Sequence, residues 1–257
     1  MSFAFLETSR KVGSEVAFMH QYRFRIPHAS SADFEQVFAS PKTIRSETII
    51  PAVIEIQSLA AAKGGWAILS GGWAVRWQCQ RLVGNRSASP ELDFLVDSLT
   101  AARMVEDLGL GFMVNWGCYV GTRRLNEAIT IRLDINNCDI APDAVYKAPI
   151  ENGQHLCSHP LAMIAPFELI MGKLVRTYQR LSRGLEPHQR DRFDIASLLI
   201  GQDSLSYLPK LEQEAASDLR VLSSLQSLAL PESIVEYLEE KETETLSEVI
   251  QKITTSK

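Results

Sequence analysis

The chain has 257 residues, of which 46% are hydrophobic and 22% are charged. These values are ordinary for a globular protein and exclude an intrinsically disordered one. A net charge of −5 gives no global reason to expect a long nucleic-acid footprint, although local basic clusters can still bind phosphates. The length suits one large domain or two modest ones.

The cysteines and the apolar runs indicate the compartment. Four cysteines are irregularly spaced and form no CxxC pair, which favours reduced thiols over a disulfide framework. No run approaches the 18 apolar residues of a membrane span. We therefore expect a soluble, cytoplasmic protein that binds no membrane.

The first third of the chain contains one clear helix pattern. Residues 1–46 carry weak signals, with a short strand-like alternation at residues 21–26, and are interpreted as an N-terminal extension. Apolar residues then recur at helical spacing over residues 47–63, until Gly64 and Gly65 stop the run. A helix is therefore expected to lead into the next strand.

The stretch 66–82 predicts a phosphate-binding corner. A short apolar run at 66–69 is followed by Gly71 and Gly72 and by a helix-like segment at 73–82. A strand that turns through two glycines into a helix exposes backbone N–H groups at the helix start, and no side chain keeps a phosphate away. This pattern is half of a nucleotide site.

Glu91 and Asp93 supply the other half. Residues two apart on a strand point to the same face, so both carboxylates project together while Leu92 and Phe94 face the core. Two adjacent carboxylates repel each other, and a divalent cation relieves the repulsion. Mg²⁺ commonly combines one or two carboxylates with substrate phosphates.

A third carboxylate is expected from a later strand. Ser98 or Thr100 can cap a helix over residues 101–108, and strands are predicted at 112–116 and 128–135. In the second of these strands Arg132 and Asp134 share one face. Asp134 is therefore a candidate third acid.

The remainder divides into a loop-rich linker and helices. Residues 136–160 are rich in Asn, Gly and Pro, whereas Pro166 suits the first turn of a helix that carries Lys173, Arg176 and Arg180 on one stripe. Further helices are expected at about 187–200, 208–226, 232–240 and 243–255. We predict an α/β domain over residues 1–158, which includes the extension, and a helical domain over residues 159–257.

Three segments together resemble the nucleotidyltransferase superfamily, which has the DNA polymerase beta-like fold. They are ILSGGWAV, ELDFLV and IRLDI. The segments FELIMGKLVRTYQR and RDRFDIASLL are similar to the later motifs of the AbiEii/AbiGii toxin-type nucleotidyltransferases, and GGWAV is also like the aminoglycoside nucleotidyltransferases. The resemblance implies a mixed β-sheet flanked by helices and followed by a C-terminal helical bundle.

The resemblance also implies roles for individual residues. The NTP would be bound by Ser70, Gly71, Gly72, Lys173 and Arg180, and Mg²⁺ or Mn²⁺ by Glu91, Asp93 and Asp134. The catalytic set would be Glu91, Asp93, Asp134, Lys173 and Asp191. Asp194 would be the partner of Asp191.

The implied activity is transfer of a nucleoside monophosphate from an NTP to a hydroxyl of RNA, a protein or a small molecule. A toxin-like role would bring a cognate antitoxin-like partner. Two departures keep alternatives open: Glu91 stands where the family usually has Asp, and the spacing from the glycine pair to the acids is longer. The alternatives are a catalytically decayed nucleotide-binding or interaction protein, and a phosphodiester or nucleotide hydrolase that uses water as acceptor.

Each feature also has a plainer explanation when taken alone. A Gly-Gly turn is common, an acid-x-acid strand is often a solvent-facing edge, and Lys173 by default is a solvated helix residue. Asp191 and Asp194 suit caps or salt bridges. His155, Cys157 and His159 match no common zinc spacing.

Overall fold

The computed structural model describes residues 44–79, 82–83, 89–113, 117–138, 144–147, 150–151, 154–155, 160–200, 207–228 and 238–255. Side chains are described throughout these ranges except at 146–147, 150–151 and 154–155. The predictions for residues 1–43, for the side chains of His155, Cys157 and His159, and for most of the helix at 232–240 lie outside the described residues.

A mixed seven-stranded sheet has the order β3-β4-β5-β2-β1-β9-β6. Its strands are β1 (Ala67–Ser70), β2 (Glu91–Val96), β3 (Gly111–Met113), β4 (Cys118–Arg124), β5 (Thr130–Asn137), β6 (Val145–Lys147) and β9 (Ala162–Ile164). The pairs β2–β5 and β1–β9 are parallel, and the other neighbours are antiparallel. A separate hairpin pairs β7 (Ile150–Glu151) with β8 (Gln154–His155).

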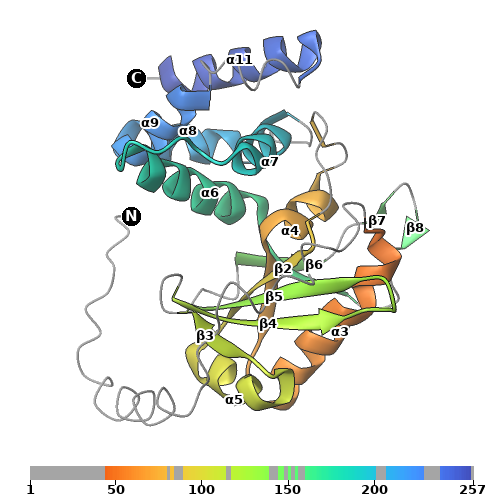
Figure 1. Cartoon of the computed structure of the whole chain (residues 1–257). Coiled ribbons are helices and arrows are strands. Elements are labelled where there is room, and N and C mark those ends of the chain that lie inside the picture. Colours follow the sequence, from red (N-terminus) through yellow and green to blue (C-terminus); the bar gives the residue numbers. More distant parts are fainter. Residues whose placement is uncertain are drawn as a thin grey trace, which may run out of the picture.

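Helices cover both faces of this sheet (Figure 1). One side carries α3 (Ser46–Ala62) and α5 (Ser98–Leu108), and α4 (Gly71–Gln78) lies on the other side. Above α4 stack the C-terminal helices α6 (Pro166–Leu181), α7 (Gln189–Ile200), α8 (Leu208–Ser217), α9 (Leu219–Leu228) and α11 (Glu240–Thr255). The expected α/β class, with a mixed sheet flanked by helices and followed by a helical bundle, is confirmed.

Helix α5 shows how local chemistry fixes a boundary. The predicted caps Ser98 and Thr100 are wrong, because the Asp97 side chain accepts a hydrogen bond from the Thr100 backbone N–H at 3.0 Å. At the other end Gly109 adopts a left-handed φ of +60°, which ends the helix. The N-cap is therefore Asp97, one residue before Ser98.

Three other elements differ from the sequence-based expectation. Helix α4 begins at Gly71, two residues earlier than predicted, and the single helix expected over 208–226 is divided between α8 and α9 at Asp218. The glycines of residues 117–121 favour a turn, but Gly121 belongs to β4 and pairs with Leu133 inside the sheet. A Cβ at Gly121 would lie 2.7 Å from the Leu110 Cδ2, so a larger residue there would require the Leu110 side chain to move.

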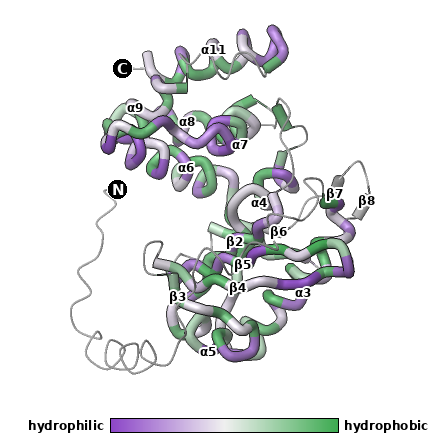
Figure 2. The backbone as a smooth tube through the Cα atoms, in the orientation of Figure 1, coloured by the Kyte–Doolittle hydropathy of each residue, from purple (hydrophilic) through white to green (hydrophobic). Residues whose placement is uncertain are grey.

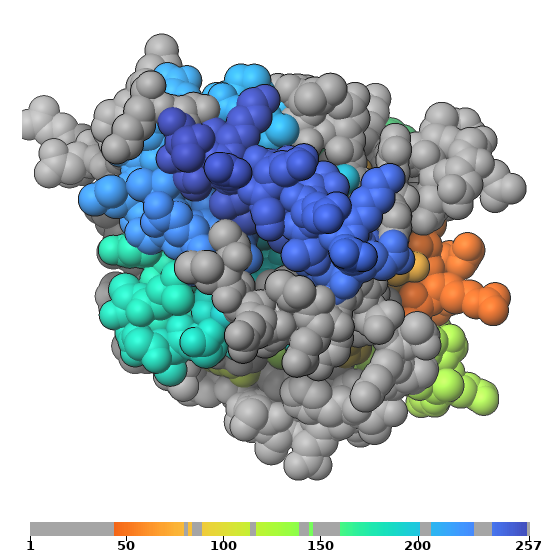
Figure 3. All heavy atoms as spheres, turned by 90° about the horizontal axis from the view of Figure 1, so that it is seen from above, coloured from red at the N-terminus to blue at the C-terminus, as the bar shows by residue number. Residues whose placement is uncertain are grey.

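One hydrophobic core joins the sheet to the C-terminal helices. It contains the fully buried Leu92 and Phe94 and continues without a break to Ile250 and Ile253 of α11. Figure 2 shows apolar and polar residues alternating along these helices, and Figure 3 shows α11 crossing the upper face of the molecule. Strand β9 follows the expected domain boundary near residue 158 yet pairs with β1, so the boundary itself stays a prediction.

None of the helices within the described ranges combines the length and the apolar character needed to cross a bilayer.

Candidate active site

The corner between β1 and α4 brings Gly71 close to the carboxylate of Asp93. Ser70 is the extended residue before the helix, and its side chain makes no capping hydrogen bond. Gly71 follows with a φ of +65°, and a Cβ added to it would lie 2.0 Å from Oδ2 of Asp93. Only glycine suits both the conformation and the close approach. The amide end of α4, which has a partial positive charge, thus lies beside the acid strand.

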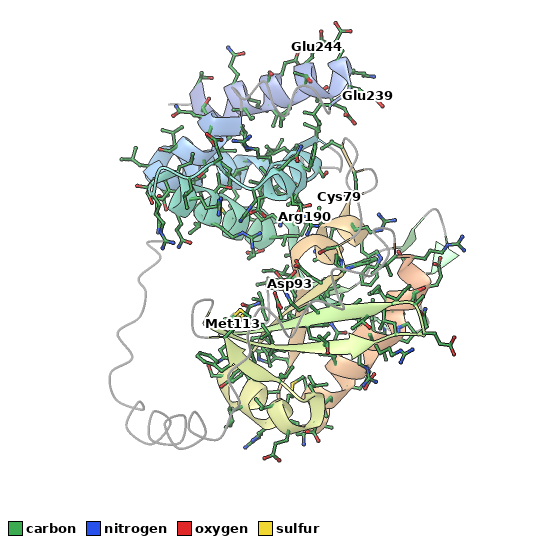
Figure 4. The ribbon with its side chains drawn as sticks, viewed as in Figure 1. Cys79, Asp93, Met113, Arg190, Glu239 and Glu244 are labelled. Carbon is green, nitrogen blue, oxygen red and sulfur yellow. The ribbon has the colours of Figure 1, made fainter. Side chains whose placement is uncertain are left out.

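Ser70, Asp93 and Asp134 form a row across three strands. Ser70 pairs with Asp93 in the antiparallel β1–β2 ladder, and Asp93 pairs with Asp134 in the parallel β2–β5 ladder. Directly opposed residues project to the same face of a sheet. Their side chains therefore share the face opposite to the buried Leu92 and Phe94, and Figure 4 shows Asp93 below the C-terminal helices.

Arg132 binds two of the three predicted acids. Its Nε and Nη2 donate to Oδ1 and Oδ2 of Asp134 at 2.8 and 2.7 Å, and Nη2 lies 3.1 Å from Oε1 of Glu91. Burial alone would lower the pKa of this guanidinium, but the hydrogen bonds to Asp134 and the charges of the three carboxylates raise it. Arg132 is thus a permanent cation within the acid cluster.

Asp93 differs from its two acidic neighbours. Within the described part of the chain no group donates a hydrogen bond to its carboxylate or forms an ion pair with it. Burial, followed by the charges of Asp134 and Glu91, raises its pKa to about 6, against the opposing effect of Lys173 and Arg176. A divalent cation bound at this position would stabilise the charged form of Asp93.

A second cationic group lies at the entry to β2. Nη1 of Arg190, at the start of α7, lies 3.9 Å from Oε2 of Glu91 and 3.5 Å from Oγ of Ser89. Ser89 Oγ also donates to Glu91 at 3.3 Å. Figure 4 shows Asp93 between the sheet and the helical bundle, with Arg190 above it. The exposed guanidinium of Arg190 is therefore close to the acids.

Four charged side chains connect α6 to α7. Lys173 Nζ lies 2.6 Å from Oδ2 of Asp194 and 3.4 Å from Oδ1 of Asp191, and all three side chains are buried. Asp191 also accepts from Arg176, whose side chain is 55% exposed. The charges of Lys173 and Arg176 both reach Asp93. This charged network fixes Arg176 near the acid strand.

The remaining predicted residues are placed differently. Gly72 lies in the first turn of α4, next to Gly71. Arg180 lies near the end of α6, seven residues beyond Lys173, and its Nε donates to the Glu186 carbonyl at 2.7 Å. The structure therefore brings Ser70, Gly71, Gly72 and the three acids together, with the Lys173–Asp191 pair above them and Arg180 farther along the helix.

Three residues with contacts to the acids were not predicted: Arg132, Ser89 and Arg190. The alternation in IRLDI placed Arg132 on the same face as Asp134, which was a usable signal for their pairing. Contacts of Arg190 with Ser89 and Glu91 depend on how α7 packs on the sheet, so no local pattern predicts them.

The donor set can be compared with what a divalent cation requires. Within the described residues, no three His, Cys, Asp or Glu side chains are arranged to hold a metal ion as they stand. Two of the three candidate acids, Asp134 and Glu91, are instead in contact with Arg132. The unpartnered Asp93, with Glu91 nearby on the same face, still fits Mg²⁺ or Mn²⁺, because one or two carboxylates are sufficient when substrate phosphates complete the shell.

Comparisons with known proteins found similar solved structures, including the two below, but no similar sequence. No family model matches the chain, and no curated protein matches it. An antigenic nucleotidyltransferase-like protein from Paracoccidioides brasiliensis is 13% identical with a TM-score of 0.47, and the match covers 81% of this chain and 94% of that chain. The antibiotic-resistance factor ANT(2'')-Ia is 13% identical with a TM-score of 0.37, covering 80% and 93% respectively. Both likenesses are distant, so the function has to follow from the geometry of the site.

Proposed function

We propose that this protein is a metal-dependent nucleotidyltransferase, which transfers a nucleoside monophosphate from an NTP to a hydroxyl acceptor. The observation that supports this most is the contact between the amide end of α4 at Gly71 and the unpartnered carboxylate of Asp93. A triphosphate needs amides and cationic groups, and a divalent cation needs carboxylates. Both sets of groups meet at this corner.

The triphosphate is bound by groups from three elements in this proposal. The backbone amides of Gly71 and Gly72 receive phosphate oxygens at the start of α4. The exposed guanidinium groups of Arg176 and Arg190 balance the phosphate charge from the side of the helical bundle. Lys173 is a positioning residue, because its ammonium is buried between two aspartates that hold Arg176.

The acids complete the reaction centre. Asp93 and Glu91 would hold Mg²⁺ or Mn²⁺, which when bound polarises the phosphates and neutralises charge that develops on their oxygens. The acceptor oxygen forms a bond to the α-phosphorus, the bond from that phosphorus to the bridging oxygen breaks, and pyrophosphate leaves with the electron pair. Asp134 takes the hydroxyl proton, since a carboxylate that accepts two hydrogen bonds keeps further lone pairs.

Labelled NTPs test this function. The protein is incubated with each α-labelled NTP and Mg²⁺ or Mn²⁺, with RNA, the protein itself or small hydroxylated molecules as acceptor. Label on an acceptor is the expected result. Release of free nucleoside monophosphate would replace the transferase by a hydrolase, and NTP binding without any turnover would identify a decayed nucleotide-binding protein.

Asp93→Asn tests the central residue. The change removes the negative charge at similar size, so transfer is expected to fall at least about 100-fold, in the range typical of removing one essential catalytic group. Asp107→Asn is the matched control. Asp107 is an exposed residue of α5, where it pairs with Lys63, and α5 covers the face of the sheet opposite to α4. Transfer that survives in Asp93→Asn at the level of Asp107→Asn would remove Asp93 from the mechanism.

The toxin-like role is a separate part of the proposal. It rests on the similarity of the α6 and α7 segments to the later motifs of toxin-type enzymes. RNA is therefore the first acceptor to test, and expression of the wild-type chain should slow cell growth relative to Asp93→Asn. Equal growth of both cultures would leave the transferase without a toxin role and remove the reason to expect an antitoxin-like partner.

A further inference from the structure

Arg132 lies beside both Glu91 and Asp134, two of the three acids predicted to bind a metal. It stands directly across from Glu91 in the parallel β2–β5 ladder and two residues before Asp134 on its own strand. Residues at these positions share one face. The strand pairing therefore places the guanidinium between the two carboxylates, without any contribution from a loop.

The contacts of Arg132 are those of a fixed group. Two parallel N–H···O bonds of 2.8 and 2.7 Å join it to both oxygens of Asp134, and the same Nη2 lies 3.1 Å from Glu91. Its side chain is 10% exposed, and its backbone N–H donates to the Pro90 carbonyl at 2.8 Å. A bidentate pair that is this well buried is costly to break, because both charges would lose their partner.

Charge counting gives the consequence. Glu91, Asp93 and Asp134 contribute three negative charges and Arg132 one positive charge, which leaves a formal −2 on these four residues, and the exposed Arg190, 3.9 Å from Glu91, offsets part of it. One divalent cation, held by Asp93 and Glu91, is sufficient to balance this charge, and a second would have to compete with the Arg132 guanidinium for both oxygens of Asp134. A second metal cation and the Arg132 guanidinium, both in contact with the same carboxylate, would repel each other strongly in a half-buried site.

We infer that Arg132 serves as a resident cation between Glu91 and Asp134, so that the protein binds a single divalent cation, at Asp93, in place of two. This rests on the proposed function for the identity of the cation. Arg132 is accordingly a positioning residue: it holds Asp134 and Glu91 in place and supplies the second positive charge.

Counting bound Mn²⁺ tests the inference without turnover. The loss of the free Mn²⁺ signal in electron paramagnetic resonance is measured at pH 7.5 with no nucleotide or acceptor present. Wild type is expected to bind one Mn²⁺ per chain. Two Mn²⁺ per chain, or none, would overturn the inference, and this result depends on no variant.

Two substitutions separate the charge of Arg132 from its shape. Arg132→Gln removes the charge and should allow a second Mn²⁺ to bind. Arg132→Lys keeps the charge without the bidentate fork and should still bind one. A merely structural role would affect both variants alike and add no second Mn²⁺.

A matched control is Arg123→Gln. Arg123 is on β4 and pairs with the exposed Glu55 at 2.6 Å, so one Mn²⁺ is expected. A folded Arg132→Gln that binds one Mn²⁺, or an Arg132→Lys that binds two, contradicts the inference. If Arg132→Gln fails to fold, wild type and Arg132→Lys decide. Absence of transfer in a wild type that binds one Mn²⁺ would count against the proposed function alone.

Discussion

At the scale of single residues, the acids of the site are unequal because their neighbours differ. Arg132 binds Asp134 and Glu91, whereas no hydrogen-bond donor within the described residues binds Asp93. Burial raises the pKa of both aspartates, and for Asp134 the hydrogen bonds from Arg132 oppose the rise. A carboxylate without a partner is thus retained in a position where charge is costly, which is typical of functional sites.

The raised pKa of Asp93 predicts how stability depends on pH in the metal-free protein. The pKa is about 6 in the folded chain, against an ordinary value of 3.8, so between about pH 4 and 6 the folded state holds more protons at this group than the unfolded state. The contribution of Asp93 to the free energy of unfolding therefore falls as the pH rises through this window. Other carboxylates change stability in the same range, so the test is the difference between wild type and Asp93→Asn.

That difference is measured by urea unfolding with chelator present from pH 3.5 to 7.5. Asp93→Asn should gain stability relative to wild type as the pH rises. When Mn²⁺ replaces the chelator at pH 7.5, the free energy of unfolding of wild type should rise, whereas that of the variant should not. A difference that stays constant across this range would contradict the assigned pKa of Asp93.

At the scale of elements, the start of α4 depends on one glycine. Gly71→Ala places a Cβ in a left-handed conformation and against the Asp93 carboxylate. The backbone cost alone is about 1–2 kcal/mol, and the clash adds to it. We expect a lower free energy of unfolding together with weaker binding of a non-hydrolysable NTP, as measured by urea unfolding and calorimetry.

The control for this change is Gly172→Ala. Gly172 is in the middle of α6, where a Cβ would meet nothing within 4 Å. Alanine should stabilise that helix by up to about 1 kcal/mol. If both substitutions stabilise the protein, the close approach of Gly71 to Asp93 is wrong.

The charged residues that connect α6 to α7 predict that removing the charge of Lys173 lowers the free energy of unfolding strongly. Lys173→Met leaves Asp194 and Asp191 buried with less compensation, which is expected to cost about 3–5 kcal/mol. The double change with Asp194→Leu should recover part of that loss, because it removes one of the two buried carboxylates that Lys173 contacts. Chemical unfolding measures both values.

A surface pair provides the comparison. Lys63 and Asp107 lie 2.6 Å apart but are substantially exposed, so Lys63→Met should cost no more than about 1 kcal/mol. Equal losses for Lys63→Met and Lys173→Met would show that the α6–α7 pairs are not buried from solvent.

At the scale of the whole molecule, the site lies where the sheet and the helical bundle meet. Contacts across this boundary include a hydrogen bond from the Val83 N–H to Ser197 Oγ at 3.1 Å and the 3.9 Å approach of Arg190 to Glu91. Asp93 belongs to the sheet and Arg190 to the bundle, yet Figure 4 shows them facing the same space. Docking of the two parts is therefore needed to complete the site.

Shared packing predicts one unfolding transition. A single hydrophobic core runs from Ile44 through the sheet to Ile253, and β9 belongs to the sheet although it follows the predicted boundary. We expect calorimetric and van't Hoff enthalpies to agree for the full chain. Two resolved transitions would instead support two domains that unfold independently.

The sequence by itself determined the local elements and the face on which each strand residue lies. Period-two alternation placed Glu91 and Asp93 together and Asp134 beside Arg132, since that alternation is a property of the extended backbone. The glycine pair likewise indicated the corner at Gly71. The order of these patterns indicated an α/β part followed by helices, and the resemblance to the nucleotidyltransferases implied the mixed sheet.

Only the tertiary structure decided which charges neutralise one another. The parallel pairing of β2 with β5 put Arg132 across from Glu91, and the packing of α7 brought Arg190 to the same acid. Such pairings join residues about 40 to 100 positions apart, so they depend on sheet register and helix docking, which no local pattern encodes. For the same reason the sequence predicted three equivalent metal ligands, whereas the folded chain has one unpartnered aspartate and two acids already bound by an arginine.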